Sequence, residues 1–307
     1  MREYILKTYG LTKRYSNFIA LNNVDLSLEA GKIYGLIGQN GAGKTTLMRL
    51  IAGLSIQTYG AIELFGHQEE RQRQEELKRI GILIEESGLN GNMTARENLR
   101  YYRIMRGIPG SELEEELLEM VGLKESHKKK VKNFSLGMKQ RLGIAISLLG
   151  NPELLLLDEP INGLDPVGIV EVRGLIKKIS EERHVAVLIS SHNLPELYQT
   201  CTDYIIIDQG EIKKILTQEN LEEECQHHLL IKCEKVEALV AVLEMKLGTT
   251  RFKVMPDRSV KLYDYLDQRE KVMRTLFENN ILPTHFALSG DTLESYFLSV
   301  IRGEQGV

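Results

Sequence analysis

The sequence predicts an α/β fold with a parallel central sheet, followed by a smaller α+β domain. Short apolar runs typical of buried strands alternate with helical patterns through the first 217 residues. From Leu229 onward the order becomes β-α-β-β-α-β, which is the order of a ferredoxin-like unit. We therefore expect a large domain at 1–217 and a small domain at 218–307.

The composition is that of a globular chain without a bias toward nucleic acid. The net charge of −4 leaves no overall basic footprint, so we expect no nucleic-acid partner. The three cysteines are too few for a disulfide framework, which suits a reducing compartment. The N-terminus has no signal-peptide pattern, and no apolar run approaches the roughly 18–20 residues that span a bilayer. We therefore expect a soluble, cytoplasmic protein that reaches a membrane only through a partner.

A glycine-rich stretch, residues 38–46, lies between a predicted buried strand at 33–37 and a predicted helix. It fits G-x-x-x-x-G-K-[ST], a loop whose backbone N–H groups surround the phosphates of a nucleoside triphosphate. The helix has apolar residues at helical spacing from Leu47 to Leu54, and it is expected to stop at Gly53. Because the first helical turn has unpaired N–H groups, an anion is favoured there. The expected nucleotide-binding residues of the loop are Gly38, Asn40, Gly41, Ala42, Gly43, Lys44, Thr45 and Thr46.

Four residues of this loop have expected roles. Gly41 and Gly43 let the backbone approach the phosphates, and Lys44 reaches the β- and γ-phosphate oxygens. The hydroxyl of Thr45 is an expected Mg²⁺ ligand. A structural Gly-rich turn between strand and helix is the alternative.

The segments around this loop add further strands and helices to the same domain. Alternating patterns predict short strands at 5–9 and 21–28, with Tyr15 between them. The Tyr15 ring could stack on a purine base, or it could pack against its own hairpin. Thr94 and Glu97 have the spacing of a capping box at a helix start. The other predicted elements are strands at 60–66 and 80–84, a charged helix at 67–79, helices ending near Gly150 and spanning 167–183, and strands at 204–207 and 211–215 joined by the hairpin signal Asp208-Gln209-Gly210.

Two acidic residues, Asp158 and Glu159, follow a run of four leucines that predicts a buried strand. Asp158 is suited to Mg²⁺, because this ion keeps most of its water and binds one or two carboxylates. Glu159 is placed to polarise an attacking water as a general base. A capping role at the strand end is the alternative for this pair.

His192 follows another predicted buried strand, 185–189. It could hydrogen-bond the γ-phosphate and the attacking water, with a structural histidine as the alternative. Ligands of open α/β sheets bind at the carboxyl ends of the strands. The glycine loop, Glu85, the two acids and His192 each follow a predicted strand, so we expect them to share one rim of the sheet.

Together these motifs resemble the ATP-binding subunits of ABC transporters, over residues 4 to about 216. The resemblance implies a P-loop ABC ATPase domain, with a mixed core sheet, a helical subdomain and an antiparallel β subdomain. It implies ATP and Mg²⁺ as cofactors. The matching features are Tyr15, the glycine loop, the strand with its two acids, Gly163-Leu164-Asp165 and Ser191-His192.

The roles that this resemblance implies agree with the residue types. The implied catalytic residues are Lys44, Glu159 and His192. The implied metal-binding residues are Thr45, Asp158 and Glu85, and Tyr15 would contact the base.

The segment Phe134–Met138 is implied to be the family's signature segment. The family usually writes it Leu-Ser-Gly-Gly-Gln, and here only Ser135 and Gly137 match. In the family this segment starts a helix and contacts the γ-phosphate bound by the other protomer, so both residues are expected nucleotide contacts. The resemblance therefore implies a homodimer with two ATP molecules at its interface. It also implies a separate transmembrane permease, which would hold the chain on the inner face of the cell membrane.

Glu85 stands where the family has a metal-touching glutamine. A glutamate there resembles the subfamily that exports peptide antibiotics such as bacitracin and lantibiotics. The ending Leu293-Glu294-Ser295-Tyr296-Phe297 resembles the Leu-Glu-x-x-Phe ending of drug- and peptide-exporting subunits. The implied function is ATP hydrolysis that energises export of a peptide antibiotic, bacteriocin or drug through the permease. The small C-terminal domain could regulate or dimerise.

A soluble ABC ATPase that is not coupled to transport is the alternative function. Chromosome and repair members insert long coiled coils between the glycine loop and the signature segment. Here Lys44 of the loop and Ser135 of the signature segment are only 91 positions apart. Translation-type members carry two cassettes, and this chain has one. A binding module without hydrolysis is a third reading, which Glu159 and His192 disfavour.

Overall fold

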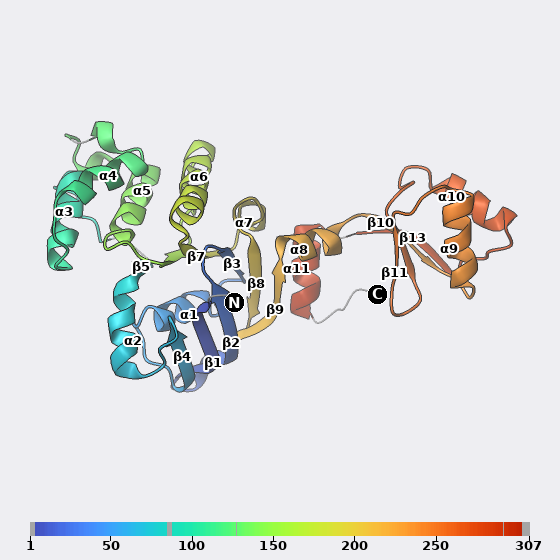
Figure 1. Cartoon of the computed structure of the whole chain (residues 1–307), viewed down its shortest axis with the longest axis horizontal. Helices are drawn as coiled ribbons and strands as arrows, with labels where there is room; N and C mark the ends of the chain where they lie inside the picture. Colours follow the sequence, from blue (N-terminus) through green and yellow to red (C-terminus); the bar gives the residue numbers. More distant parts are fainter. Residues whose placement is uncertain (1–3, 85–87, 127, 291, 303–307) are drawn as a thin grey trace. The chain divides into compact units, whose positions relative to one another are not determined.

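The computed structural model describes residues 4–84, 88–126, 128–290 and 292–302, and the chain divides into two compact units (Figure 1). The units are Met1–Gln218 and Glu219–Val307. Each has its own hydrophobic core. Within the described parts of the chain, none of the helices combines the length and the apolar character needed to cross a bilayer.

The first unit is built on a six-stranded sheet with the order β5-β6-β7-β3-β8-β9. Its strands are parallel except for β9, which pairs antiparallel with β8, so the sheet is mixed as expected. The strands are β3 (Ile33–Ile37), β5 (Ile80–Leu83), β6 (Leu154–Asp158), β7 (Ala186–Ser191), β8 (Asp203–Asp208) and β9 (Glu211–Thr217).

A three-stranded antiparallel sheet completes the β structure of this unit, with the order β2-β1-β4. The strands are β1 (Tyr4–Tyr15), β2 (Phe18–Glu29) and β4 (Tyr59–Leu64). The first two are longer than the predicted 5–9 and 21–28, because several register shifts interrupt their alternation. Such irregularities hide the two-residue period on which the prediction depends.

Helix α1 (Lys44–Ile51) packs its apolar face into the core between the two sheets. Its last helical residue is Ile51, and Gly53 follows with a positive φ of 70°. The sequence placed Leu54 on the buried face, but this residue lies beyond the helix and is 62% exposed. That part of the prediction is wrong because the chain turns at Gly53 before a further helical turn can form.

The remaining helices of the first unit include the expected helical subdomain, formed by α3, α4 and α5 (Figure 1). Thr94 and Glu97 form the predicted capping box at the start of α3. The helices are α2 (Glu70–Glu76), α3 (Ala95–Met105), α4 (Glu112–Met120), α5 (Leu136–Ser147), α6 (Pro166–Arg183) and α7 (Leu194–Thr200), with 3-10 turns at Leu77–Arg79, Lys124–Ser126 and Val131–Asn133.

The second unit contains the expected ferredoxin-like arrangement. Its antiparallel sheet has the order β11-β12-β10-β13, and α9 and α10 pack their buried residues against it. The order of elements along the chain is β-α-β-β-α-β, so this part of the fold prediction is confirmed. The elements are α8 (Gln218–Cys225), β10 (His228–Lys232), α9 (Val236–Met245), β11 (Phe252–Val254), β12 (Val260–Leu262), α10 (Arg269–Glu278), β13 (His285–Ser289) and α11 (Leu293–Arg302).

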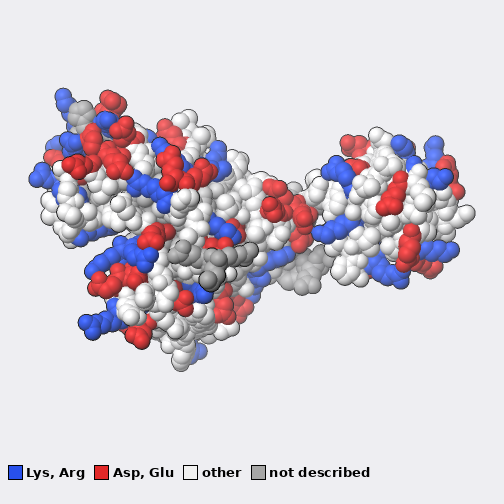
Figure 2. Space-filling view, in the orientation of Figure 1, with Lys and Arg blue, Asp and Glu red and all other residues white. Residues whose placement is uncertain are grey.

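Charged side chains of both signs intermingle on the face shown in Figure 2. This agrees with the small net charge of the chain, −4. The face in view has no extended basic surface of the kind that nucleic acids bind.

Candidate nucleotide-binding site

The glycine loop joins β3 to α1 and holds the side chain of Lys44. All five residues of β3 are buried, which fixes the start of the loop. The Lys44 Nζ donates to the carbonyl oxygens of Gly38, at 2.7 Å, and Gln39, at 3.2 Å. Lys44 is only 7% exposed, so its ammonium is positioned by the loop's own backbone.

Two neighbouring carboxylates act on the Lys44 ammonium. Burial lowers the pKa of Lys44, while the charges of Glu159 and Asp158 act in the opposite direction. Burial is the larger of these effects, because removing an ammonium from water disfavours its charged form. The charges of Lys44, Asp158 and Glu159 therefore interact with one another.

Asp158 lies at the end of β6 and contacts the first turn of α1. The Thr45 Oγ1 donates to Asp158 Oδ2 at 2.8 Å. In the sheet, β7 lies between β6 and β3, with Asp158 opposite Ser190 and Ile37 opposite Ser191. The carboxyl ends of three adjacent strands thus meet at one rim, where Thr45 reaches across from the helix.

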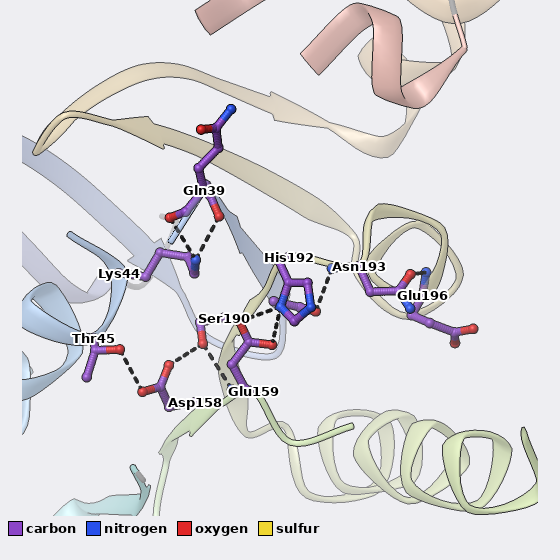
Figure 3. A network of polar contacts seen from close by, with 11 residues as sticks. Gln39, Lys44, Thr45, Asp158, Glu159, Ser190, His192, Asn193 and Glu196 are labelled. Carbon is purple, nitrogen blue, oxygen red and sulfur yellow. Dashed lines mark hydrogen bonds and ion pairs between the residues drawn. The ribbon is translucent and has the colours of Figure 1, made fainter. Parts of the chain in front are cut away.

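Glu159 and His192 face one another at the same rim (Figure 3). The His192 Nδ1 lies 3.0 Å from Glu159 Oε2 and 3.1 Å from Glu159 Oε1. The expected gathering on one rim is confirmed for the glycine loop, Asp158, Glu159 and His192. Glu85, which the sequence adds to this rim, lies outside the residues that the structure describes.

A cavity of about 320 Å³ opens over the glycine loop. It is lined by Glu159, by loop residues and by two residues of β2, so the Glu159 carboxylate and the glycine loop face the same space. The lining residues are Phe18, Ala20, Gln39, Asn40, Gly41, Gly43, Lys44, Thr45, Thr46 and Glu159.

The aromatic residue that lines this cavity is Phe18. The sequence predicted Tyr15 as the aromatic contact of a purine base. The two residues are register partners at the turn between β1 and β2. Tyr15 is 45% exposed, and the Lys13 Nζ lies 4.8 Å from the centre of its ring. The structure therefore places Tyr15 next to the cavity wall, with Phe18 in the wall itself.

The signature segment starts helix α5, as the motif requires. The Ser135 hydroxyl caps this helix by accepting a hydrogen bond from Met138 N at 3.2 Å, and the next residue, Leu136, is 51% exposed. Gly137 lies in the first turn of the same helix. Among the described residues, no hydrogen bond joins Ser135 or Gly137 to the glycine loop, and neither residue lines its cavity. Within one chain the two halves of the expected site are separate.

Comparison with known proteins identifies the family. The family model described as "ABC transporter" matches residues 21–162. The bacitracin transport ATP-binding protein BcrA of Bacillus licheniformis is 40% identical over 97% of this chain and 98% of its own length. This chain belongs to the ABC transporter ATP-binding proteins. It is an ATP-binding subunit of an ABC transporter.

Other members of this family extend the similarity. BcrA of Enterococcus faecalis is 36% identical over 98% of this chain and 97% of its own length. The lantibiotic transport ATP-binding protein SrtF of Streptococcus pyogenes is 44% identical over 74% of this chain and 99% of its own. A solved ATP-binding subunit of an ABC transporter aligns with a TM-score of 0.63 and 27% identity, covering 71% of this chain and 92% of that one.

Sequence reasoning did not identify Ser190 or Phe18 as part of the site. Ser190 contacts both Asp158 and the backbone of Glu159. In the sequence its only signal is its place in the run Ser190-Ser191-His192 after a predicted strand. Phe18 follows Tyr15 by three positions, so the predicted aromatic residue has a second aromatic residue beside it that lines the cavity. Both assignments depend on pairing between strands, which the local pattern does not contain.

Proposed function

We propose that this ABC transporter subunit hydrolyses ATP at the rim of its central sheet. The observation that carries the proposal is the contact of Glu159 with His192, 3.0 Å apart, beside a cavity that also contains Lys44. The water oxygen bonds to the γ-phosphorus while the bond from that phosphorus to the ADP oxygen breaks, Glu159 takes the proton of the water, and ADP and phosphate leave. His192 orients the Glu159 carboxylate, and Lys44 neutralises charge on the phosphate oxygens.

The residues around Asp158 fit a hard divalent cation. The Thr45 hydroxyl and the Asp158 carboxylate, 2.8 Å apart, are oxygen donors of the kind that Mg²⁺ takes together with phosphate oxygens. When bound, Mg²⁺ would neutralise negative charge that develops on the phosphates. Thr45 and Asp158 would hold it, and Glu85 is proposed as a further oxygen donor on sequence grounds alone.

A second copy of the chain would complete each site. Ser135 and Gly137 start α5 away from the glycine loop of their own chain, where helix-start N–H groups can receive a phosphate from another protomer. We therefore propose a homodimer that encloses two ATP molecules. Tyr15, beside the cavity wall, would contact the adenine.

The partner and cargo are proposed from the relatives. BcrA and SrtF are named for bacitracin and lantibiotic transport, and BcrA matches this chain over nearly its full length. We propose that a separate permease anchors the subunit at the cytoplasmic face of the membrane, and that ATP turnover drives export of a peptide antibiotic.

Co-expression of the chain with its candidate permease in a sensitive bacterium tests this proposal. We expect resistance to bacitracin or to a lantibiotic with the wild-type chain, and loss of that resistance with Lys44→Ala at equal expression. Equal sensitivity with and without the wild-type chain would refute peptide export. Mg²⁺-dependent ATP hydrolysis by the purified wild-type chain separately tests the catalytic part of the proposal.

A further inference from the structure

Ser190 occupies a fully enclosed position between the two acids of the site. It is the fifth residue of β7 and is 0% exposed. In the parallel pairing of β6 with β7 it stands directly opposite Asp158. Paired residues of adjacent strands point their side chains to the same face of a sheet, so the hydroxyl and the carboxylate are brought together.

The Ser190 hydroxyl joins two groups that the proposed reaction needs. It donates to Asp158 Oδ1 and accepts a hydrogen bond from the backbone N–H of Glu159 at 3.0 Å (Figure 3). The same N–H also lies 3.1 Å from the Ser190 carbonyl oxygen. This single hydroxyl therefore donates its proton to the Asp158 carboxylate and accepts the backbone N–H of Glu159 with an oxygen lone pair.

The backbone of Glu159 adopts a disfavoured conformation at the point where this hydroxyl contacts it. Its φ is +48°, in the left-handed region, where a residue with a Cβ is disfavoured. The next residue is Pro160, which pushes the residue before it toward extended conformations. Conformations of this kind persist when their surroundings fix them, and they are frequent at functional sites.

We propose that Ser190 is a positioning residue for ATP hydrolysis, one that fixes the backbone turn of Glu159 and the orientation of the Asp158 carboxylate. The inference rests on the proposed hydrolytic function of the site. Ser190 acts through its two neighbours, since it does not line the cavity. Its removal should therefore impair turnover much more than nucleotide binding.

Ser190→Ala tests the inference in the purified full-length chain with ATP and Mg²⁺. We expect kcat to fall roughly 10- to 100-fold, because misplacement of a reacting group by about 1 Å costs on that order. The dissociation constant for ATP should change less than about threefold, since Lys44 and the loop backbone remain in place. Ser190→Thr keeps the hydroxyl and should restore most of the rate.

Ser147→Ala is the matched control. Ser147 is also 0% exposed, but its hydroxyl donates to Ile144 O at 2.7 Å within α5. This variant should hydrolyse ATP at the wild-type rate. If Ser190→Ala does not fold, Ser190→Cys takes its place, because it keeps the size of the side chain but has a weak donor.

A second readout separates positioning from general damage. The part of the effect that passes through Glu159 should disappear in the Glu159→Gln background, so Ser190→Ala should lower that residual rate less than it lowers the wild-type rate. A Ser190→Ala variant within twofold of the wild-type rate, or one that loses ATP affinity as strongly as turnover, would overturn the inference. Absence of hydrolysis by the wild-type chain would instead refute the proposed function.

Discussion

The close approach of Gly43 to strand β2 leads to a quantitative prediction for the glycine loop. Gly43 has a φ of +110°, and a Cβ built on it would lie 2.8 Å from Ala20 O and 2.9 Å from Leu21 Cδ2. Gly41 has a φ of +84°, but a Cβ there would meet nothing within 4 Å. The two alanine substitutions therefore share backbone strain, and only Gly43→Ala adds a steric clash.

The structure sets the expected size of each effect. A left-handed conformation costs an alanine about 1–2 kcal/mol, which is the whole cost expected for Gly41→Ala. Insertion of a methyl group against β2 adds about 1–3 kcal/mol, because a well-packed region must shift to accept it. Gly43→Ala should therefore lower the free energy of unfolding by about 2–5 kcal/mol.

Urea unfolding followed by far-UV circular dichroism measures this difference, with no nucleotide present. The midpoint of the first unit's transition should fall further for Gly43→Ala than for Gly41→Ala, by about 1 M for a slope near 2 kcal/mol/M. Equal midpoints for the two variants would refute the argument that contact with β2 defines the loop. ATP binding should be lost in Gly43→Ala, because the loop backbone moves.

Three further predictions concern charged groups. Lys44→Met should abolish ATP binding. Because burial lowers the folded-state pKa of Lys44, the unfolded chain binds more protons than the folded chain as the pH approaches about 10.4. The free energy of unfolding of the wild type should therefore rise with pH in that range, and this rise should flatten in the variant. Arg103 and Glu114 form a buried ion pair at 2.8 Å, so Glu114→Ala should cost about 3 kcal/mol in urea unfolding; a loss under about 1 kcal/mol would contradict this. Hydrogen bonds from Ser259 hold the pKa of Asp257 at about 2, and Ser259→Ala should raise it in an NMR titration, whereas an unchanged value would reject that cause.

Signals confined to a few neighbouring residues predicted much of the fold. The spacing of Thr94 and Glu97 predicted their capping box, whose two hydrogen bonds are 2.7 and 3.2 Å long. The hairpin between β8 and β9 was predicted from Gln209 and Gly210, which both have positive φ values, 48° and 78°. Such features depend on local backbone chemistry, so a short stretch of sequence is enough to identify them.

Features that depend on pairing between distant segments were not predictable in the same way. The contact of Ser190 with Asp158 joins residues 32 positions apart, and it exists only because β6 and β7 are adjacent in register. The left-handed turn at Glu159 runs against the local preference of a residue before proline. The cavity position of Phe18 depends on the register of a hairpin with several shifts. Tertiary structure decides each of these cases.

Glu159→Gln tests most directly the claim that the rim of the sheet is a hydrolytic site completed by a second chain. The measurement pairs the steady-state rate of ATP hydrolysis with the ATP-dependent change in molar mass, for wild type and variant. We predict that the variant binds ATP and dimerises in its presence but hydrolyses it at least about 100-fold more slowly. Hydrolysis at the wild-type rate would contradict the assignment of Glu159 as the base, and a chain that stays monomeric with bound ATP would contradict completion of the site by a second copy.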